Sequence, residues 1–324
     1  MGKKRIVRVD NDRSEILLYE ALEEFLDEKA AIGTSQKTID NYRQSLAYFI
    51  DFEFDEDDML IGDIQKIYVQ QWVASMMKAK KRATTINHYL RDLRAFLYWC
   101  MHEDRRYIEP SFKVELVKAQ EPLPKTFTDE EVEALCAQPV NVKDFTEWRT
   151  WAVVNWVVAT GNRAATVCEL QIGDIDFANK QIFIRRTKNK KAQVLPLTPS
   201  LENVIKNYIR KCRNGCSASD WLFPNVSDEQ LSYTALAKSF KKYCYERGVE
   251  HHNIHGLRHY FATYWARTGG SGDKLQLALG HSTYDMTKKY MHLVDRDLKE
   301  DFDIFNPLEN IKRGSSRKRK VNMK

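Results

Sequence analysis

Two short motifs and a tyrosine in the last third of the chain decide its fold: His255-Gly256-Leu257-Arg258, Leu279-Gly280-His281 and, nine residues after that histidine, Tyr290. Because His255 and Arg258 are three residues apart, they share one face at the start of a predicted helix. Gly280 ends a further helix and leaves the next histidine at a corner. Each residue alone is compatible with a structural role, such as a capping histidine or a packed tyrosine. Their combination indicates a site.

Two basic positions upstream suit contact with phosphate. Arg163 follows the glycine break of Thr160-Gly161-Asn162-Arg163, where a helix start can face an anion. Lys188 lies in a polar turn between two predicted strands, residues 181–186 and 193–197. An ammonium group at a hairpin tip can reach a DNA groove or protonate a leaving oxygen. Lys190 and Lys191 lie beside it, so position alone does not choose among the three lysines.

The pattern divides the chain into segments of different character. Residues 14–108 carry apolar stripes of helical period and no strand-like alternation. Prolines mark residues 109–126 as an extended linker. Residues 127–300 mix helices with the two predicted strands, and basic residues are frequent in the flanking segments 1–13 and 301–324. The fold class expected is mainly α with a small β-sheet, in two domains.

Local signals predict several helix boundaries. Thr38 is placed to cap the second helix of the first segment, and Thr84 or Thr85 to cap the fourth. A third helix is expected around residues 67–77. Thr128 with Glu131 three residues on has the form of a capping box. The largely apolar residues 148–160 indicate a buried helix.

The composition is that of a globular protein. The chain has 324 residues, 43% of them hydrophobic and 30% charged, with no apolar run of membrane-spanning or signal-peptide type, so no membrane partner is expected. The net charge of +6 depends on the C-terminal end, because residues 312–324 hold seven basic residues and no acid, and the rest sums to −1. Such a tail suits a polyanion-binding arm or a solvated end. The six cysteines show no paired spacing and are expected to be reduced thiols in a cytoplasm.

The ordered set of motifs resembles that of the tyrosine recombinases. That family has an Arg after a Thr-Gly pair, a Lys in a β-hairpin, a His-x-x-Arg, a Leu-Gly-His and a Tyr nine residues after the last His. This sequence has all five in order, with Arg258 and His281 twenty-three residues apart. Residues 187–197 look like the family's hairpin and place its lysine at Lys188, while Thr38-Ile39-x-x-Tyr42 and residues 85–90 look like helix starts of its N-terminal domain. The resemblance covers about residues 15–300.

The resemblance implies a helical, SAM-like domain that clamps DNA, followed by an α+β catalytic domain. It implies a site-specific recombinase or integrase that cuts and rejoins DNA through a 3′-phosphotyrosyl intermediate, with no cofactor and no metal. The catalytic residues expected from it are Arg163, Lys188, His255, Arg258, His281 and Tyr290. The DNA contacts expected beside them are Lys78, Lys80, Lys81, Arg82, Thr85, Asn87, Arg91, Lys190 and Lys191.

The implied chemistry divides one difficult phosphoryl transfer into two steps. Tyr290 attacks a backbone phosphate and expels a 5′ hydroxyl, to which Lys188 gives a proton. Arg163 and Arg258 hold the nonbridging oxygens with fork-shaped donors, and such donors contribute roughly 3 kcal/mol each in comparable sites. His255 helps to take the proton of the tyrosine, a group whose ordinary pKa is about 10. His281 hydrogen-bonds the phosphate.

One position departs from the family pattern. Relatives usually carry an acid three residues after the first arginine; here Thr166 stands there, and Glu169 lies six residues on. The difference bears on how Arg163 is oriented.

The resemblance also implies a homotetramer on double-stranded DNA with paired sites, helped by a DNA-bending or directionality protein. The C-terminal segment has apolar residues to dock on a neighbouring protomer: Phe302, Ile304, Phe305, Leu308 and Ile311.

Several functions stay open on the sequence alone. A first helix near Ser14 leaves no room for a separate arm-binding domain, which points to a compact integrase or a Xer-like resolvase of chromosome or plasmid dimers. The basic tail favours an integrase of a mobile element acting at the nucleoid. A type IB topoisomerase uses similar chemistry without paired sites, and an inactive relative would bind DNA without cutting. A zinc-binding regulator would use Cys212, Cys216, His251 and His252.

Overall fold

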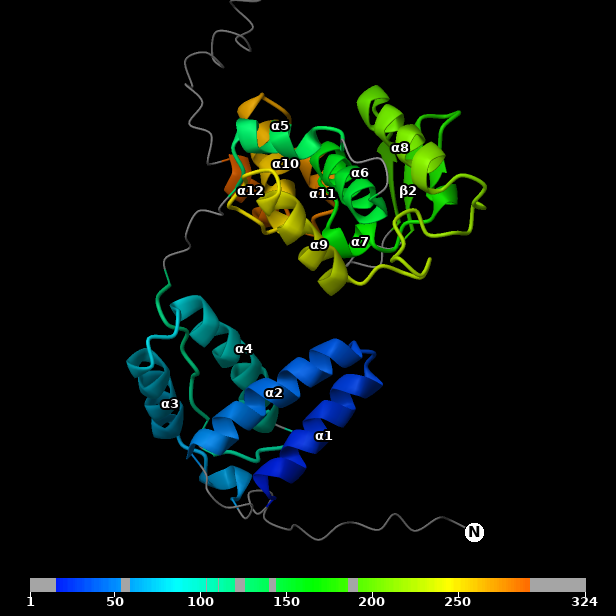
Figure 1. The fold of residues 1–324 in the computed structure, drawn as a ribbon. Helices are drawn as coiled ribbons and strands as arrows, with labels where there is room; N and C mark the ends of the chain where they lie inside the picture. Colours follow the sequence, from blue (N-terminus) through cyan, green and yellow to red (C-terminus); the bar gives the residue numbers. More distant parts are fainter. Residues whose placement is uncertain are drawn as a thin grey trace, which may run out of the picture. The chain divides into compact units, whose positions relative to one another are not determined.

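The computed structural model describes residues 16–53, 59–102, 104–109, 111–119, 126–139, 144–185 and 192–291 (Figure 1). The chain divides into two compact units, Met1–Pro122 and Leu123–Lys324, called here the first and second units. Within the described ranges, no helix has both the length and the apolar character needed to cross a membrane. The flanking segments 1–13 and 301–324 and the expected hairpin lysines Lys188, Lys190 and Lys191 lie outside the described residues.

The first unit is built from helices (Figure 1), and they enclose a core rich in aromatic side chains. Its elements are α1 Leu18–Ala31, α2 Gln36–Glu53, η1 Ile61–Asp63, α3 Lys66–Lys78 and α4 Ala83–Cys100. Phe25, Trp72 and Phe96 are completely buried or nearly so, and the Phe25 and Phe96 rings meet edge-on with centroids 5.5 Å apart. Large aromatic side chains dominate the energetics of such a core because each buries a large apolar area.

Two predicted helix caps in the first unit are wrong. Helix α2 begins before Thr38, and the Ser35 hydroxyl accepts a hydrogen bond from the Thr38 backbone N–H at 3.3 Å. Helix α4 begins at Ala83, ahead of both Thr84 and Thr85, with Arg82 at the N-cap position and no side-chain cap. The apolar stripes are as predicted, but α2 starts two residues before Thr38 and α4 starts one residue before Thr84.

Part of the predicted linker packs against the first unit. Val114 is buried, and Phe112 and Leu116 pack against the same core. The Asn87 amide of α4 donates to the Val117 carbonyl and accepts from the Val117 N–H, both at 2.8 Å. Asn87 is 5% exposed, so the expectation that it contacts DNA is corrected: its amide holds the backbone of the segment 111–119.

The second unit surrounds a central helix and carries a small sheet (Figure 1). Its helices are α5 Asp129–Cys136, α6 Phe145–Thr160, α7 Ala164–Val167, η2 Ile172–Asp174, α8 Pro199–Cys212, α9 Tyr233–Tyr245, α10 His255–Arg267, α11 Gly272–Leu279 and α12 Asp285–Met291. Strands β1 Ile175–Asp176, β2 Gln181–Ile184 and β3 Gln193–Pro196 pair antiparallel in the order β1-β2-β3. The expected fold class, mainly α with a small β-sheet, is confirmed.

Helix α6 is the centre of the second unit. It buries side chains around its whole circumference, among them Trp148, Trp151 and Trp156, as a helix enclosed on all sides must. It begins three residues before the predicted start, because the Asp144 carboxylate caps it by accepting from the Glu147 N–H at 3.0 Å. The predicted capping box at the start of α5 is confirmed.

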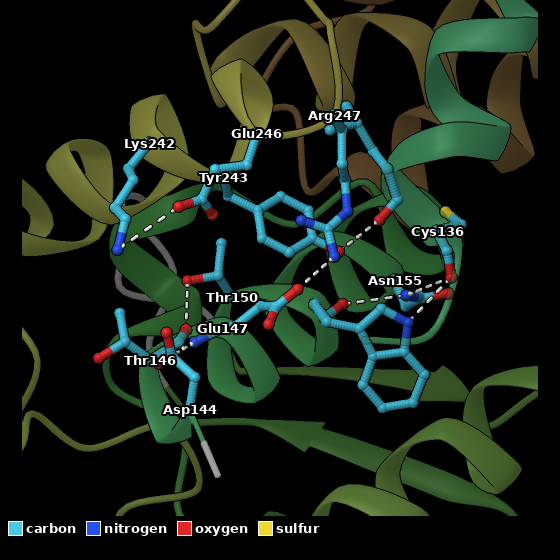
Figure 2. Close-up of polar contacts among 12 residues, drawn as sticks. Cys136, Asp144, Thr146, Glu147, Thr150, Asn155, Lys242, Tyr243, Glu246 and Arg247 are labelled. Atoms are coloured by element: carbon cyan, nitrogen blue, oxygen red, sulfur yellow. Dashed lines mark hydrogen bonds and ion pairs between the residues drawn. The ribbon is translucent and has the colours of Figure 1, made fainter. Parts of the chain in front are cut away.

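Polar contacts fix α6 to its neighbours (Figure 2). The Trp151 indole N–H donates to the Cys136 carbonyl, the last residue of α5, at 2.9 Å. Arg247, just after α9, pairs with Glu147 at 2.8 Å and lies over the Tyr243 ring at 3.5 Å. These contacts hold the N-terminal half of α6 against α5 and α9.

We expect Gly161→Ala to lower the free energy of unfolding by about 3 kcal/mol, because overpacking of a core adds to backbone strain. Gly161 ends α6 with φ +66°, and a Cβ there would lie 2.5 Å from Phe261 Cδ1 and 2.8 Å from Leu279 Cδ2. Gly215→Ala is the control, since Gly215 has φ +82° and nothing within 4 Å of a Cβ; it should cost about 1 kcal/mol. Urea unfolding measures both, and equal losses would contradict the packing argument.

Candidate active site

Arg163 is held by the turn that ends α6. The Thr160 hydroxyl donates to the Trp156 carbonyl at 2.7 Å, and the Trp156 indole N–H donates to the Asn162 side-chain oxygen at 2.9 Å. Gly161 supplies the left-handed residue between them. Arg163 follows as the half-buried N-cap residue of α7. Partial burial lowers the pKa of Arg163, while the nearby Tyr290 hydroxyl acts in the opposite direction.

Arg258 ties three helices together. It is 3% exposed, and its guanidinium donates to the Gly161 carbonyl at 2.8 Å and to the Leu279 carbonyl at 3.0 Å. These carbonyls stand at the C-terminal ends of α6 and α11, where backbone oxygens lack helical partners. Burial and the neighbouring Arg163 lower the pKa of Arg258 to about 10. Two close cations in a poorly solvated position favour binding of an anion.

His281 stands at the corner after α11, as the Leu-Gly-His motif predicts. Gly280 has φ +61°, and the His281 Nδ1 lies 2.8 Å from the hydroxyl of Thr287, a fully buried residue of α12. The His281 and Tyr290 rings are nearly parallel, at 13°, with centroids 6.5 Å apart. Burial and the positive charges of Arg258 and Arg163 lower the pKa of His281 to about 4.

Tyr290 points its hydroxyl at a histidine that the sequence analysis did not single out. Tyr290 is 6% exposed, and its Oη lies 2.6 Å from the Nδ1 of His259. Burial raises the pKa of Tyr290, and Arg258 and Arg163 lower it. His259 follows Arg258 directly and stands one helical turn after His255. That four-residue spacing was the available signal, since it places both histidines on one face of α10.

His255 contacts His259 and not the tyrosine hydroxyl. Their rings meet at 87° with centroids 4.8 Å apart, and part of the His255 surface is open to solvent. Burial of the rest, followed by His259, Arg258 and Arg163, lowers the pKa of His255 to about 4. His255 is therefore neutral at neutral pH.

The structure thus brings five of the six expected catalytic residues into one electrostatically coupled group. They are Arg163, His255, Arg258, His281 and Tyr290. Lys188 lies outside the described residues. Thr166 and Glu169 line one cavity of about 480 Å³ together with Arg185. Among the described residues no carboxylate forms an ion pair with Arg163. No other acid there takes the place of the one that relatives carry at the position of Thr166.

The expected DNA contacts of the first unit fall around the junction of α3 and α4. Lys78, Lys80 and Arg82 are exposed, and Lys80 takes a left-handed conformation with φ +56°. Lys81 is half-buried and lies over the Tyr48 ring at 5.0 Å. Thr85 and Arg91, on α4, are also exposed. Together these side chains are called here the basic surface at the α3–α4 junction of the first unit.

The arrangement defines the class of the protein. Residues 125–296 match the phage integrase family, and residues 22–104 match the N-terminal SAM-like domain of phage integrases. The first match covers more than half of the chain. The chain belongs to the phage integrase family and is a tyrosine recombinase.

Individual relatives agree with this class. The chain is 26% identical over 287 residues to the tyrosine recombinase XerD of Listeria innocua, covering 85% of this chain and 94% of that protein. It is 27% identical to the tyrosine recombinase XerC of Thermodesulfovibrio yellowstonii, covering 85% and 92%. Two solved structures share the fold. One is the XerH site-specific recombinase bound to a palindromic difH substrate (TM-score 0.68, 20% identity, 91% of each chain). The other is the Tn1549 transposon integrase with a circular intermediate DNA (TM-score 0.71, 17% identity, 88% and 99%).

The depressed pKa of His281 predicts loss of stability in acid. Because its folded pKa of about 4 lies below the unfolded value of about 6.5, the unfolded chain binds the proton better. The stability that neutral His281 contributes to the fold is fully present above the unfolded pKa of about 6.5. It is lost as the pH falls from there to the folded pKa of about 4. We expect the urea midpoint to decrease between pH 7 and pH 5, and His281→Asn to reduce that decrease. His252→Gln, at an exposed histidine, should leave it unchanged. An identical pH dependence in His281→Asn would contradict the assignment.

Proposed function

We propose that Tyr290 is the nucleophile of a site-specific DNA recombinase and becomes joined to a 3′ phosphate. The observation that carries the proposal is the buried Tyr290 hydroxyl, which contacts an imidazole and lies within electrostatic reach of Arg163 and Arg258. The Tyr290 ring packs in an apolar cluster with Leu275 and Leu279, while its hydroxyl, among cations and neutral bases, is placed to attack an anionic ester.

The other side chains have complementary functions in this proposal. Arg163 and Arg258 bind the nonbridging oxygens of the scissile phosphate, and their charge increases its reactivity. Arg258 uses two of its five N–H groups on carbonyls, which fixes the guanidinium and leaves N–H groups for the phosphate. His281, held by Thr287, hydrogen-bonds the same phosphate. Lys188 is proposed from the sequence to protonate the leaving 5′ oxygen.

The basic surface at the α3–α4 junction supports binding to double-stranded DNA. Lysine and arginine contacts to phosphates dominate such binding and make it salt-dependent. We propose that Lys78, Lys80, Lys81, Arg82, Thr85 and Arg91 contribute on the first unit, with Lys190 and Lys191 of the hairpin on the second. The substrate in this proposal is double-stranded DNA of the nucleoid that carries paired recombination sites.

The biological reaction has two candidates. Integration or excision of a mobile element is favoured by the basic tail and by the similarity to the Tn1549 transposon integrase. Resolution of chromosome or plasmid dimers is favoured by the XerD and XerC relatives, which match most of their length. The location of the sites separates the two, since an integrase acts at the ends of an element and a resolvase at a site in the replicon.

Assembly on DNA is proposed to be tetrameric. An apolar cavity of about 540 Å³ lies between β3 and α11, lined by residues including Leu195, Phe261 and Leu277. Val194 and Leu277, which also line this cavity, are 54% and 73% exposed, and adjoining exposed apolar side chains of this kind mark surfaces that a partner covers. The apolar residues of segment 301–311 have the chemistry to cover such a surface on a neighbouring protomer. An accessory DNA-bending protein remains part of the proposal.

Tyr290→Phe tests the nucleophile. Wild-type protein is incubated with fragmented DNA of its source, denatured in detergent, and the attached DNA is recovered and sequenced. We expect nucleotide on the peptide that contains Tyr290, at one recurrent sequence, and complete loss of the covalent complex in Tyr290→Phe. Tyr284→Phe, at an exposed tyrosine six residues earlier, should retain it. Attachment at scattered sequences would indicate a topoisomerase, and attachment in Tyr290→Phe would refute the nucleophile.

Truncation separates docking from charge in the C-terminal segment. A chain that ends at Asp301 lacks both the apolar residues and the basic tail, whereas one that ends at Ile311 lacks only the basic tail. We expect the shorter chain to bind single sites but to lose tetramers on paired sites, and the longer chain to keep them. Mass measurement of the protein–DNA complexes in solution distinguishes the two. Tetramers of the shorter chain would contradict the docking proposal.

A further inference from the structure

We propose that His259 is the group that takes the proton of Tyr290 when the tyrosine attacks DNA. The inference rests on the proposed function. His255, the histidine of the His-x-x-Arg motif, then acts on the tyrosine only through His259. The assignment gives the nucleophile a base that the motif residues do not supply.

The contact geometry supports this assignment. The Tyr290 Oη and the His259 Nδ1 are 2.6 Å apart, within the range of direct proton transfer between a phenol and an imidazole. The planes of the two rings are inclined by 40°, with centroids 5.8 Å apart. Both residues lie within helices, α10 and α12, that pack against each other. The pair is therefore held by rigid elements and not by a loop.

The neighbouring residues fix the imidazole. Arg258, the preceding residue, is anchored to the ends of α6 and α11 by its two carbonyl contacts. His255 packs edge-on against the His259 ring one turn earlier on α10, with centroids 4.8 Å apart. Rotation of His259 away from the tyrosine is thus restricted, which is a requirement of a positioned base.

The charges around His259 keep it able to accept a proton. Burial and the charge of Arg258 lower the pKa of His259, so the ring is neutral at neutral pH. The titratable groups that face the pair are His255 and Arg258 on α10, Arg163 at the start of α7 and His281 before α12. None of them is anionic. A DNA phosphate brings negative charge among these groups, which favours the imidazolium at the moment the proton has to move.

The step balances without a further reactant. The Tyr290 Oη forms a bond to phosphorus and its proton moves to the His259 Nδ1. The bond between phosphorus and the 5′ oxygen breaks, and that oxygen takes a proton from Lys188. In rejoining, a 5′ hydroxyl attacks phosphorus and gives its proton back to the neutral Lys188 amine, the bond between phosphorus and the tyrosine oxygen breaks, and the phenol recovers its proton from the His259 imidazolium.

His259→Gln tests the inference, because glutamine can hydrogen-bond the phenol but cannot accept its proton. The probe is a nicked duplex that carries the recurrent sequence recovered with wild-type protein, and the rate of covalent complex formation is followed from pH 5 to 10. Wild type should reach a plateau above the His259 pKa. His259→Gln should be slower by about 100-fold at pH 7, and its rate should keep rising up to pH 10, because burial raises the pKa of Tyr290 above its ordinary value and hydroxide then has to remove the proton. The difference between the two proteins should narrow as the pH rises.

Two controls separate chemistry from folding. His252→Gln, at an exposed histidine of the preceding loop, should follow the wild-type profile. The His259→Ala variant should regain rate with added imidazole, in proportion to its free-base fraction. A purely structural defect would lower the rate equally at all pH values and would gain nothing from imidazole, and either result overturns the inference.

A substrate with sulfur in place of the bridging 5′ oxygen shows whether His259 acts on the attacking tyrosine or on the leaving group. A thiol leaving group has a pKa of about 8.5 and needs no proton from the enzyme. His259→Gln should stay slow on this substrate, and restoration of its rate would show that His259 serves the leaving group instead. Absence of any covalent complex with wild-type protein would refute the proposed function itself. A wild-type complex with an unchanged rate and pH profile in His259→Gln would refute only the present inference.

Discussion

The buried guanidinium of Arg258 is the constraint on which the site depends. Its bonds to the Gly161 and Leu279 carbonyls join the C-terminal ends of α6 and α11 to the start of α10. Each of those helices continues directly into another member of the site, Arg163 after α6 and His281 after α11. A single charged side chain thereby sets the positions of its own functional partners. Charge-assisted bonds to carbonyls of helix ends are well suited to this, since those oxygens have no partner within the helix.

The same arrangement is costly before DNA arrives. Two guanidiniums share a poorly solvated position, and three histidines beside them have lowered pKa values. Burial of like charges stabilises a fold poorly, and a bound phosphate relieves the repulsion. In the proposed function, relief of this repulsion contributes to the binding of the scissile phosphate. Burial raises the pKa of Tyr290, so its phenol is protonated in the free protein.

The sequence predicted the fold class and five expected site residues that the structure brings together, because its strongest signals were local. Glycine breaks at Gly161 and Gly280 and the spacing of His255 and Arg258 each report on one turn of backbone. Signals that depend on tertiary packing were missed. His259 was missed because its spacing from His255 indicates only a shared face of α10, whereas its contact with Tyr290 depends on how α12 packs against α10. Asn87 looked like a polar DNA contact, and only the packing of the segment 111–119 shows that its amide is occupied.

The structure of Tyr290→Phe bound to a duplex that carries one recombination site tests the central claim most directly. The account predicts the scissile phosphate within hydrogen-bond distance of Arg163, Arg258 and His281, with Arg258 still bonded to the Gly161 and Leu279 carbonyls. The ring of residue 290 should then lie in line with the leaving 5′ oxygen, beside His259. A phosphate bound away from the two arginines, or an Arg258 that leaves the helix ends to reach it, would contradict the account.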